Sequence, residues 1–209
     1  MIRATTLIVG CIFAAALYGC AGSQAVHEID VGRVVLVTGN PALALKHFEQ
    51  AAALDAAHRS PPLQESAWTY VGRARYEIKE YPLARQAFER ALALNRNDAV
   101  AGLYLGLVSA RAESNEASRR QIQEGLQAVE SQLEYIKRYT PMGEFWDPSG
   151  RVSAEITASI KTFATAPNNW GDAIAEVERL ALDLEKEIDA SRRDESYQRR
   201  SGGSGSGDM

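Results

Sequence analysis

The sequence predicts an all-α protein built from repeated antiparallel helix pairs, and three observations support this fold class. Segments in the first half of the chain match one another at an offset of about 40 residues. Apolar residues in the second half recur three and four positions apart, which is the spacing of one helix face. Stretches that contain proline or glycine separate these segments and predict the connections between helices.

Composition narrows the class of protein. Of 209 residues, 45% are hydrophobic and 24% are charged, so the chain can form a buried core. The net charge of -4 argues against nucleic acid as a partner, because nucleic-acid binders usually carry a strongly basic face. Cys11 and Cys20 are the two cysteines. Both lie in the first twenty residues, which excludes a disulfide scaffold or a cysteine metal site in the remainder.

The first residues have the organisation of a secretory signal. Arg3 provides a basic start, an apolar run follows at 7–17, and small residues precede Cys20. The apolar run is shorter than the roughly 20 residues that a membrane span needs. The sequence therefore predicts a signal peptide at residues 1–19.

The segment Leu17-Tyr18-Gly19-Cys20 resembles the lipobox of bacterial lipoproteins. The resemblance implies cleavage before Cys20 and acylation of this cysteine, and more than one acyl chain gives stable anchoring. Ala21 resembles the outer-membrane sorting signal, so we expect an outer-membrane anchor facing the periplasm in a Gram-negative host and a cell-membrane anchor otherwise. The alternative is an ordinary signal peptide that happens to contain a cysteine.

Two copies of a repeat follow the signal peptide. Val31-Gly32-Arg33 matches Val71-Gly72-Arg73, and later matches share the same offset: Leu43-Ala44 with Leu83-Ala84, Phe48-Glu49 with Phe88-Glu89, Ala51 with Ala91, and Ala53-Leu54 with Ala93-Leu94. The proline-containing segment 57–62 predicts a connecting loop between the copies.

The second copy resembles a tetratricopeptide (TPR) repeat, whose period is about 34 residues. The matching positions are Trp68, Gly72, Ala84, Phe88 and Ala91, while Arg75 and Arg96 depart from the pattern. The first copy keeps Gly32, Ala44 and Phe48 but has Glu28 at the tryptophan position. A third copy is degenerate, because Leu105-Gly106 repeats the first-helix element but the second helix lacks the alanine and phenylalanine of the pattern. The resemblance implies a solenoid of about three helix pairs over residues 20–138, and the alternative is a generic antiparallel bundle.

The remainder of the chain is predicted to complete this domain. Residues 139–150 form a turn-rich loop that contains Phe145 and Trp146, either pinned to the body or contacting a partner. Residues 151–195 predict two capping helices, the second with an apolar stripe over 170–188 and Asn169 as its N-cap. That stripe is also compatible with a coiled-coil seam. Residues 196–209 are predicted to be a flexible Gly/Ser tail.

No motif for catalysis is present. The three histidines, His27, His47 and His58, lack the spacing of metal ligands, and no nucleophile motif occurs. We therefore expect no enzyme activity, no cofactor and no metal site.

Binding is the function that the repeat resemblance implies. Groove-lining positions of TPR proteins correspond here to Arg33, Thr69, Arg73, Tyr76, Glu77, Leu103, Leu107 and Arg111. We expect a lipid-anchored scaffold or adaptor that binds a protein or peptide in this groove, in cell-envelope assembly. Arg33 and Arg73 are predicted either to bind a partner carboxylate or to pair with Glu28, Glu65 or Glu77. The alternative function is a structural lipoprotein that self-assembles through the C-terminal helix.

Overall fold

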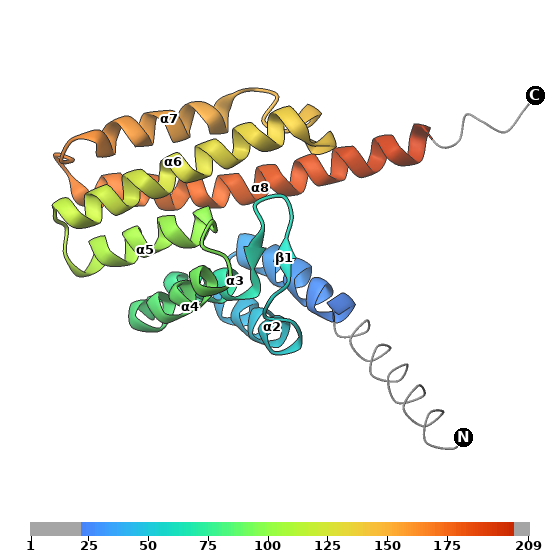
Figure 1. The fold of residues 1–209 in the computed structure, drawn as a ribbon, viewed down its shortest axis with the longest axis horizontal. Helices are drawn as coiled ribbons and strands as arrows, with labels where there is room; N and C mark the ends of the chain where they lie inside the picture. The colour runs from blue at the N-terminus through green and yellow to red at the C-terminus, as the bar shows by residue number, and fades with distance from the viewer. Residues whose placement is uncertain (1–21, 203–209) are drawn as a thin grey trace, which may run out of the picture. The chain divides into compact units, whose positions relative to one another are not determined.

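The structure is a computed structural model and describes residues 22–202. The predicted signal peptide, Cys20 and residues 203–209 of the predicted tail lie outside the described residues. The described chain is all-α, apart from one small hairpin (Figure 1). Its helices are a segment at 22–37, α2 (Pro41–Leu54), α3 (Ala67–Glu77), α4 (Tyr81–Leu94), α5 (Ala99–Ala112), α6 (Glu116–Tyr139), the 3-10 helix η1 (Pro141–Glu144), α7 (Arg151–Ala164) and α8 (Trp170–Gly202), and its strands are β1 (Arg59–Ser60) and β2 (Glu65–Ser66).

The chain divides into two compact units, Met1–Arg96 and Asn97–Met209. The division separates the third sequence copy from the first two. Helices α5 and α6, which correspond to that copy, belong to the same unit as α7 and α8.

In the first unit, the second helices of the two copies have matching bounds. Helices α2 and α4 each contain 14 residues and each carry a proline in their first two positions, where a proline is tolerated. Asn40 caps α2 by accepting a hydrogen bond from the amide of Leu43 at 3.2 Å. Both helices end at a leucine. The backbone amide of the following residue donates to a carbonyl four residues earlier: Asp55 to Ala51 after α2, and Asn95 to Ala91 after α4.

The same close contact joins the two helices of each copy. A Cβ atom on Gly32 would lie 2.4 Å from Cε1 of Phe48, and a Cβ atom on Gly72 would lie 2.4 Å from Cε1 of Phe88. Each phenylalanine ring is fully buried. Only glycine therefore fits at these two positions while the rings keep their places.

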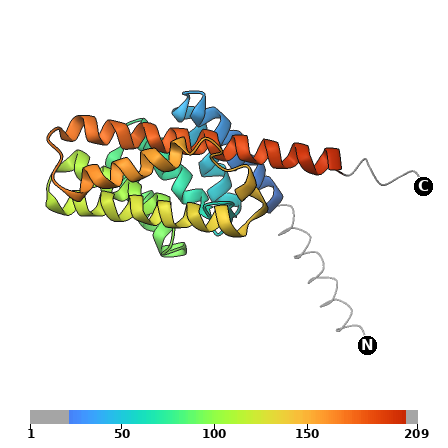
Figure 2. The ribbon, with the colours of Figure 1, turned by 90° about the horizontal axis from the view of Figure 1, so that it is seen from above.

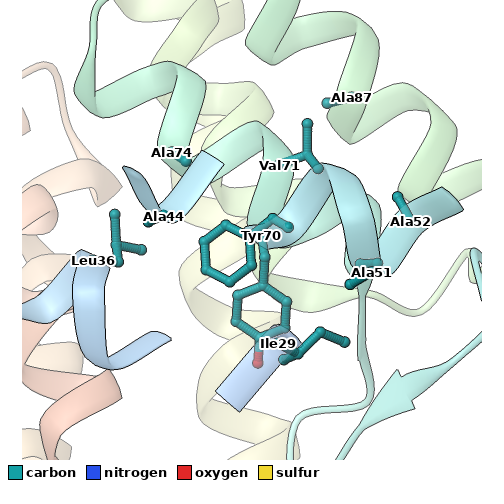
Figure 3. Close-up of a cluster of buried hydrophobic side chains, with 11 residues drawn as sticks. Ile29, Leu36, Ala44, Ala51, Ala52, Tyr70, Val71, Ala74 and Ala87 are labelled. Atoms are coloured by element: carbon teal, nitrogen blue, oxygen red, sulfur yellow. The ribbon is translucent and has the colours of Figure 1, made fainter. Parts of the chain in front are cut away.

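The phenylalanine of the first copy also packs against the second copy. Phe48 stacks on Tyr70 with 5.1 Å between ring centroids and 27° between ring planes. Figure 3 shows the ring of Tyr70 near Ile29, inside a cluster of buried side chains from the segment 22–37, α2, α3 and α4. This cluster is the core of the first unit.

The connection between the copies is non-helical, as predicted, and it contains a hairpin that the sequence did not indicate. Strands β1 and β2 pair antiparallel, with Ser60 opposite Glu65. The guanidinium of Arg59 donates to the carbonyl of Leu94 at 3.2 Å, and the side-chain amide Nδ2 of Asn95 donates to the backbone carbonyl of Gln64 at 3.3 Å. These two hydrogen bonds attach the hairpin segment to the C-terminal end of α4.

In the second unit, α5 and α6 approach each other at the backbone. A Cβ atom on Gly106 would lie 2.7 Å from the amide nitrogen of Ile122, and one on Gly125 would lie 2.5 Å from Cα of Leu103. Ile122 lies as far after Gly106 in sequence as Phe88 lies after Gly72. No aromatic ring separates the helices at this position, so their backbones pack directly.

Helices α6, α7 and α8 lie side by side in both views, and α7 runs opposite to its neighbours (Figures 1 and 2). Arg119 of α6 connects α6 to α7, because its guanidinium donates to the carbonyl of Phe163 near the end of α7. The same guanidinium also donates to Glu116 within α6. On the surface, Asp183 of α8 binds Arg151 of α7 at 3.3 Å.

Helix α8 is longer than predicted. It continues to Gly202, so residues 196–202, which were assigned to a flexible tail, are helical. The segment that follows Ile188 contains no proline or glycine before Gly202. Glu195 and Arg199 also form an i,i+4 ion pair at 2.6 Å. The predicted boundary at residue 195 was wrong, because the Gly/Ser composition of residues 201–207 does not extend to residues 196–200.

The Gly–Phe contact generates a prediction on stability. We expect Gly72→Ala to lower the free energy of unfolding by about 1–3 kcal/mol, because the added methyl group overlaps the buried ring of Phe88. The control is Gly102→Ala in α5, where a Cβ atom meets nothing within 4 Å. Alanine there is expected to be neutral or stabilising by up to about 1 kcal/mol. Urea denaturation measures both, and equal effects would contradict the packing argument.

Candidate functional site

Most side chains of the predicted groove are buried. On α3, Thr69, Arg73 and Tyr76 are at most 3% exposed, whereas Glu77 is half-buried. On α5, Leu103 and Leu107 are also buried.

Arg33 of the segment 22–37 is buried as well, and its guanidinium lies 3.7 Å from Asp30. A partner cannot contact a side chain that solvent does not reach. The prediction that these residues bind a partner is therefore corrected for six of them: Arg33, Thr69, Arg73, Tyr76, Leu103 and Leu107.

The hairpin explains the burial of Arg73. Glu65 of β2 is 2% exposed, and its carboxylate accepts hydrogen bonds from the hydroxyl of Tyr70 at 2.9 Å and from the guanidinium of Arg73 at 3.2 Å. The guanidinium also lies 5.6 Å from the centroid of the Tyr70 ring. Of the two roles predicted for Arg73, the structure favours pairing with Glu65 over binding a partner carboxylate.

Two of the predicted groove residues remain accessible. Glu77 is half-buried at the end of α3. Arg111 of α5 has a side chain that is 32% exposed, and its guanidinium lies 2.5 Å from the carboxylate of Glu178 on α8. Any partner that contacts Arg111 has to compete with this ion pair.

The residues assigned to repeat packing are buried, apart from Trp68. Gly32, Ala44, Phe48, Gly72, Ala84, Phe88, Ala91 and Gly106 are all buried. Trp68 is half-buried, and the guanidinium of Arg90 lies 4.6 Å from the centroid of its ring.

The aromatic loop is held against the second unit. Trp146 is 2% exposed, and Phe145 is half-buried. The hydroxyl of Ser191 donates to the carbonyl of Phe145 at 3.1 Å, and the amide of Asp147 donates to the carboxylate of Glu187 at 3.1 Å. These contacts support the interpretation that the loop is pinned to the body.

Asp147 is a structural residue that the sequence analysis missed. Its carboxylate accepts hydrogen bonds from the amides of Val152 and Ser153 at 3.1 and 2.8 Å, and from the hydroxyl of Ser153 at 2.7 Å. Burial raises the pKa of Asp147, but these hydrogen bonds and the positive charge of Lys137 outweigh burial and lower that pKa below its ordinary value. An aspartate shortly before the predicted helix was the available signal.

A tyrosine pair is a second feature that the sequence analysis missed. Tyr135 and Tyr139 of α6 are 60% and 69% exposed, and their ring centroids lie 5.1 Å apart. They lie outside the buried stripe of that helix, which contains Leu133 and Ile136. Tyrosine is enriched among the residues that carry binding energy at protein interfaces, and here two of its rings lie together on one exposed face. The spacing of four residues off the apolar stripe was the signal available in the sequence.

Residues 22–202 contain no cluster of three or more side chains suited to a metal ion. No helix within this range has the length and hydrophobicity of a membrane span. The Nδ1 atom of His47 lies 2.7 Å from a carboxylate oxygen of Glu28, so this histidine serves an ion pair or hydrogen bond between helices.

Comparison with models of known protein families gives no match, and a search of curated proteins finds no relative. The TPR resemblance therefore depends on the residues of this chain alone.

The buried carboxylate of Glu65 generates the second prediction. Glu65→Ala is expected to lower the free energy of unfolding by about 3–5 kcal/mol, because it removes the carboxylate that compensates the buried Arg73. The matched control is Glu80→Ala, since Glu80 pairs with Arg75 at 3.0 Å but is 44% exposed. That change should cost less than about 1 kcal/mol. A loss below about 1 kcal/mol for Glu65→Ala, measured by thermal unfolding, would show that the pair is not structural.

The hydrogen-bonded carboxylate of Asp147 generates a prediction that depends on pH. The folded pKa is below the unfolded value of about 3.9, so the ionised carboxylate stabilises the fold above that pH. This contribution disappears as the pH falls through the lowered pKa. We expect Asp147→Asn to cost about 1–2 kcal/mol at neutral pH and less at about pH 2.5. Urea denaturation at both pH values measures the difference, and an equal cost at both would contradict the role of the charge.

Proposed function

We propose that this chain is a lipid-anchored, non-enzymatic scaffold of the tetratricopeptide type, which binds a protein partner at the membrane surface on the periplasmic side. The observation that carries the proposal is the shared contact of Gly32 with Phe48 and of Gly72 with Phe88. A repeated packing unit at a fixed offset is the property of helical-repeat proteins, and such proteins commonly act by binding other proteins.

The anchor in this proposal is Cys20. Its support is the lipobox resemblance of Leu17-Tyr18-Gly19-Cys20, together with the signal-like segment before it. In a Gram-negative host, the outer membrane is the expected location, and the scaffold would assist assembly of the cell envelope.

The partner surface needs a different location from the predicted groove. The six buried side chains do not offer one, and the tyrosine pair Tyr135 and Tyr139 is the better candidate in the second unit. Arg138 lies between them in sequence and is 69% exposed, with its guanidinium 3.6 Å from Glu134. Tyrosine and arginine supply much of the binding energy in protein interfaces, which favours this face of α6 over the remaining surface.

Self-assembly through the 170–188 stripe has less support. Ile174, Val177, Leu184 and Ile188 are buried in the structure, so that stripe already has intramolecular neighbours. A second copy would have to displace them. Light scattering of the intact protein tests this alternative, since a monomer at high concentration rejects it.

The proposal predicts the behaviour of three variants in cells. Cys20→Ala should abolish incorporation of labelled palmitate, because the variant lacks the sulfur that is acylated. A photoreactive residue at Tyr135 should give one dominant crosslinked protein. The double change Tyr135→Ala with Tyr139→Ala should weaken binding of that protein at least about tenfold, whereas the stability of the fold should change little because both rings are exposed.

The matched control uses Tyr197 of α8, which is 73% exposed. A photoreactive residue there should give no dominant product, and Tyr197→Ala should leave binding unchanged. Equal labelling from Tyr135 and Tyr197 would reject the tyrosine pair as the partner surface. If Cys20→Ala incorporated as much labelled palmitate as the unaltered protein, the lipid anchor would be rejected independently.

A further inference from the structure

A hollow of about 560 Å³ opens on the surface of the first repeat copy. The segment 22–37 and α2 provide its lining: Gln24, His27, Glu28, Gln50, Ala53 and Leu54. The hollow lies entirely in the first unit and shares no residue with the tyrosine pair of α6. It is therefore a candidate binding surface in addition to the tyrosine pair.

The residues that line the hollow differ from their counterparts in the second repeat copy. At the offset that relates the copies, Glu28 corresponds to Trp68 and Gln50 corresponds to Arg90. In the second copy the guanidinium of Arg90 lies 4.6 Å from the centroid of the Trp68 ring. The first copy has a shorter carboxylate and a shorter amide at these two positions. Two of the residues that line the hollow therefore occupy the sequence positions at which the second copy pairs an indole with a guanidinium.

One further difference between the copies places a hydrogen-bond partner beside the carboxylate of Glu28. His47 stands where the second copy has Ala87, and its Nδ1 atom lies 2.7 Å from a carboxylate oxygen of Glu28. The side chain of Glu28 remains 24% exposed, so the carboxylate can accept another hydrogen bond.

The remaining lining supplies apolar surface. Ala53 and Leu54 are exposed at the end of α2, and Leu54 is 38% exposed. The amides of Gln24 and Gln50 add groups that accept hydrogen bonds. The lining thus combines the apolar surface of Ala53 and Leu54 with the carboxylate of Glu28 and the polar side chains of Gln24, His27 and Gln50. An occupant with an apolar face and a hydrogen-bond donor at its edge matches this combination.

We propose that the hollow binds the tryptophan side chain of a partner peptide. The indole ring packs on Ala53 and Leu54, in the place that Trp68 takes within the second copy. Its Nε1–H donates to the carboxylate of Glu28, which His47 holds in place. Tryptophan is well suited to such a site, because it combines a large apolar surface with a single donor.

The test uses the full chain with isotope-labelled methyl groups and three small probes, observed by NMR. The probes are N-acetyltryptophanamide, N-acetylphenylalaninamide, which lacks the donor, and N-acetylargininamide. The tryptophan probe should shift the methyl signals of Ala53 and Leu54 and saturate in the millimolar range. The other two probes should bind at least about tenfold more weakly, because neither combines a bicyclic ring with the N–H donor.

Two variants test the assignment to Glu28. Glu28→Trp restores the residue of the second copy and fills the hollow, so it should abolish the shifts. Glu28→Gln keeps the shape and removes the charge, and it should weaken binding about threefold to tenfold. This second variant keeps the test decisive if Glu28→Trp does not fold. Glu89→Trp, on the exposed surface of α4, is the control and should leave binding unchanged.

Three results would overturn the proposal. The first is no saturable shift of the Ala53 or Leu54 methyl groups with the tryptophan probe. The second is stronger binding of the arginine probe, which would make the hollow a cation site. The third is tryptophan binding that survives in folded Glu28→Trp or is unaffected by Glu28→Gln.

Discussion

The close approach of a glycine to a phenylalanine ring is the contact on which the first unit depends. Gly32 lies against Phe48, and Gly72 lies against Phe88, with no room for a Cβ atom in either case. The absence of a side chain lets the two helices of a pair come together around a single buried ring. Phe48 then stacks on Tyr70, so the ring that closes the first pair also joins it to the second. One packing unit thereby provides both the helix pair and its connection to the next.

The inserted hairpin changes what the repeat can present to a partner. It delivers Glu65 to a buried position beside α3, where the carboxylate binds Tyr70 and Arg73. Tyr70 and Arg73 are of residue types that often form interfaces, but here both side chains are buried and paired with Glu65. Because a buried charge requires a nearby countercharge and hydrogen bonds, this arrangement commits Arg73 to structure. The exposed chemistry is found elsewhere, at the tyrosine pair of α6 and at the hollow beside Glu28.

Divergence between the copies is informative because the copies share one packing pattern. Where both retain the same residues, as at Gly32 and Gly72, the position serves the fold. Where they differ in a coordinated way, the first copy has a different local chemistry. The first copy has Glu28 and His47 at the positions where the second copy has Trp68 and Ala87. A hollow lies beside the carboxylate of Glu28. The third copy diverges further, since Ile122 in place of a phenylalanine brings the backbones of α5 and α6 together.

The sequence by itself determined the all-α class, most of the helices, the repeat offset and the buried positions of the repeat, because spacing and residue size are local properties. It also indicated Asn169 as a cap, whose side chain accepts a hydrogen bond from the amide of Asp172. Only the tertiary structure decided which polar side chains are exposed. Arg73 has the character of a surface residue until folding places Glu65 beside it. The helical continuation to Gly202 was within reach of the sequence, because no proline or glycine interrupts the segment and Glu195 and Arg199 have i,i+4 spacing. Burial is a property of neighbours brought together by folding, so residue type alone does not assign a binding surface.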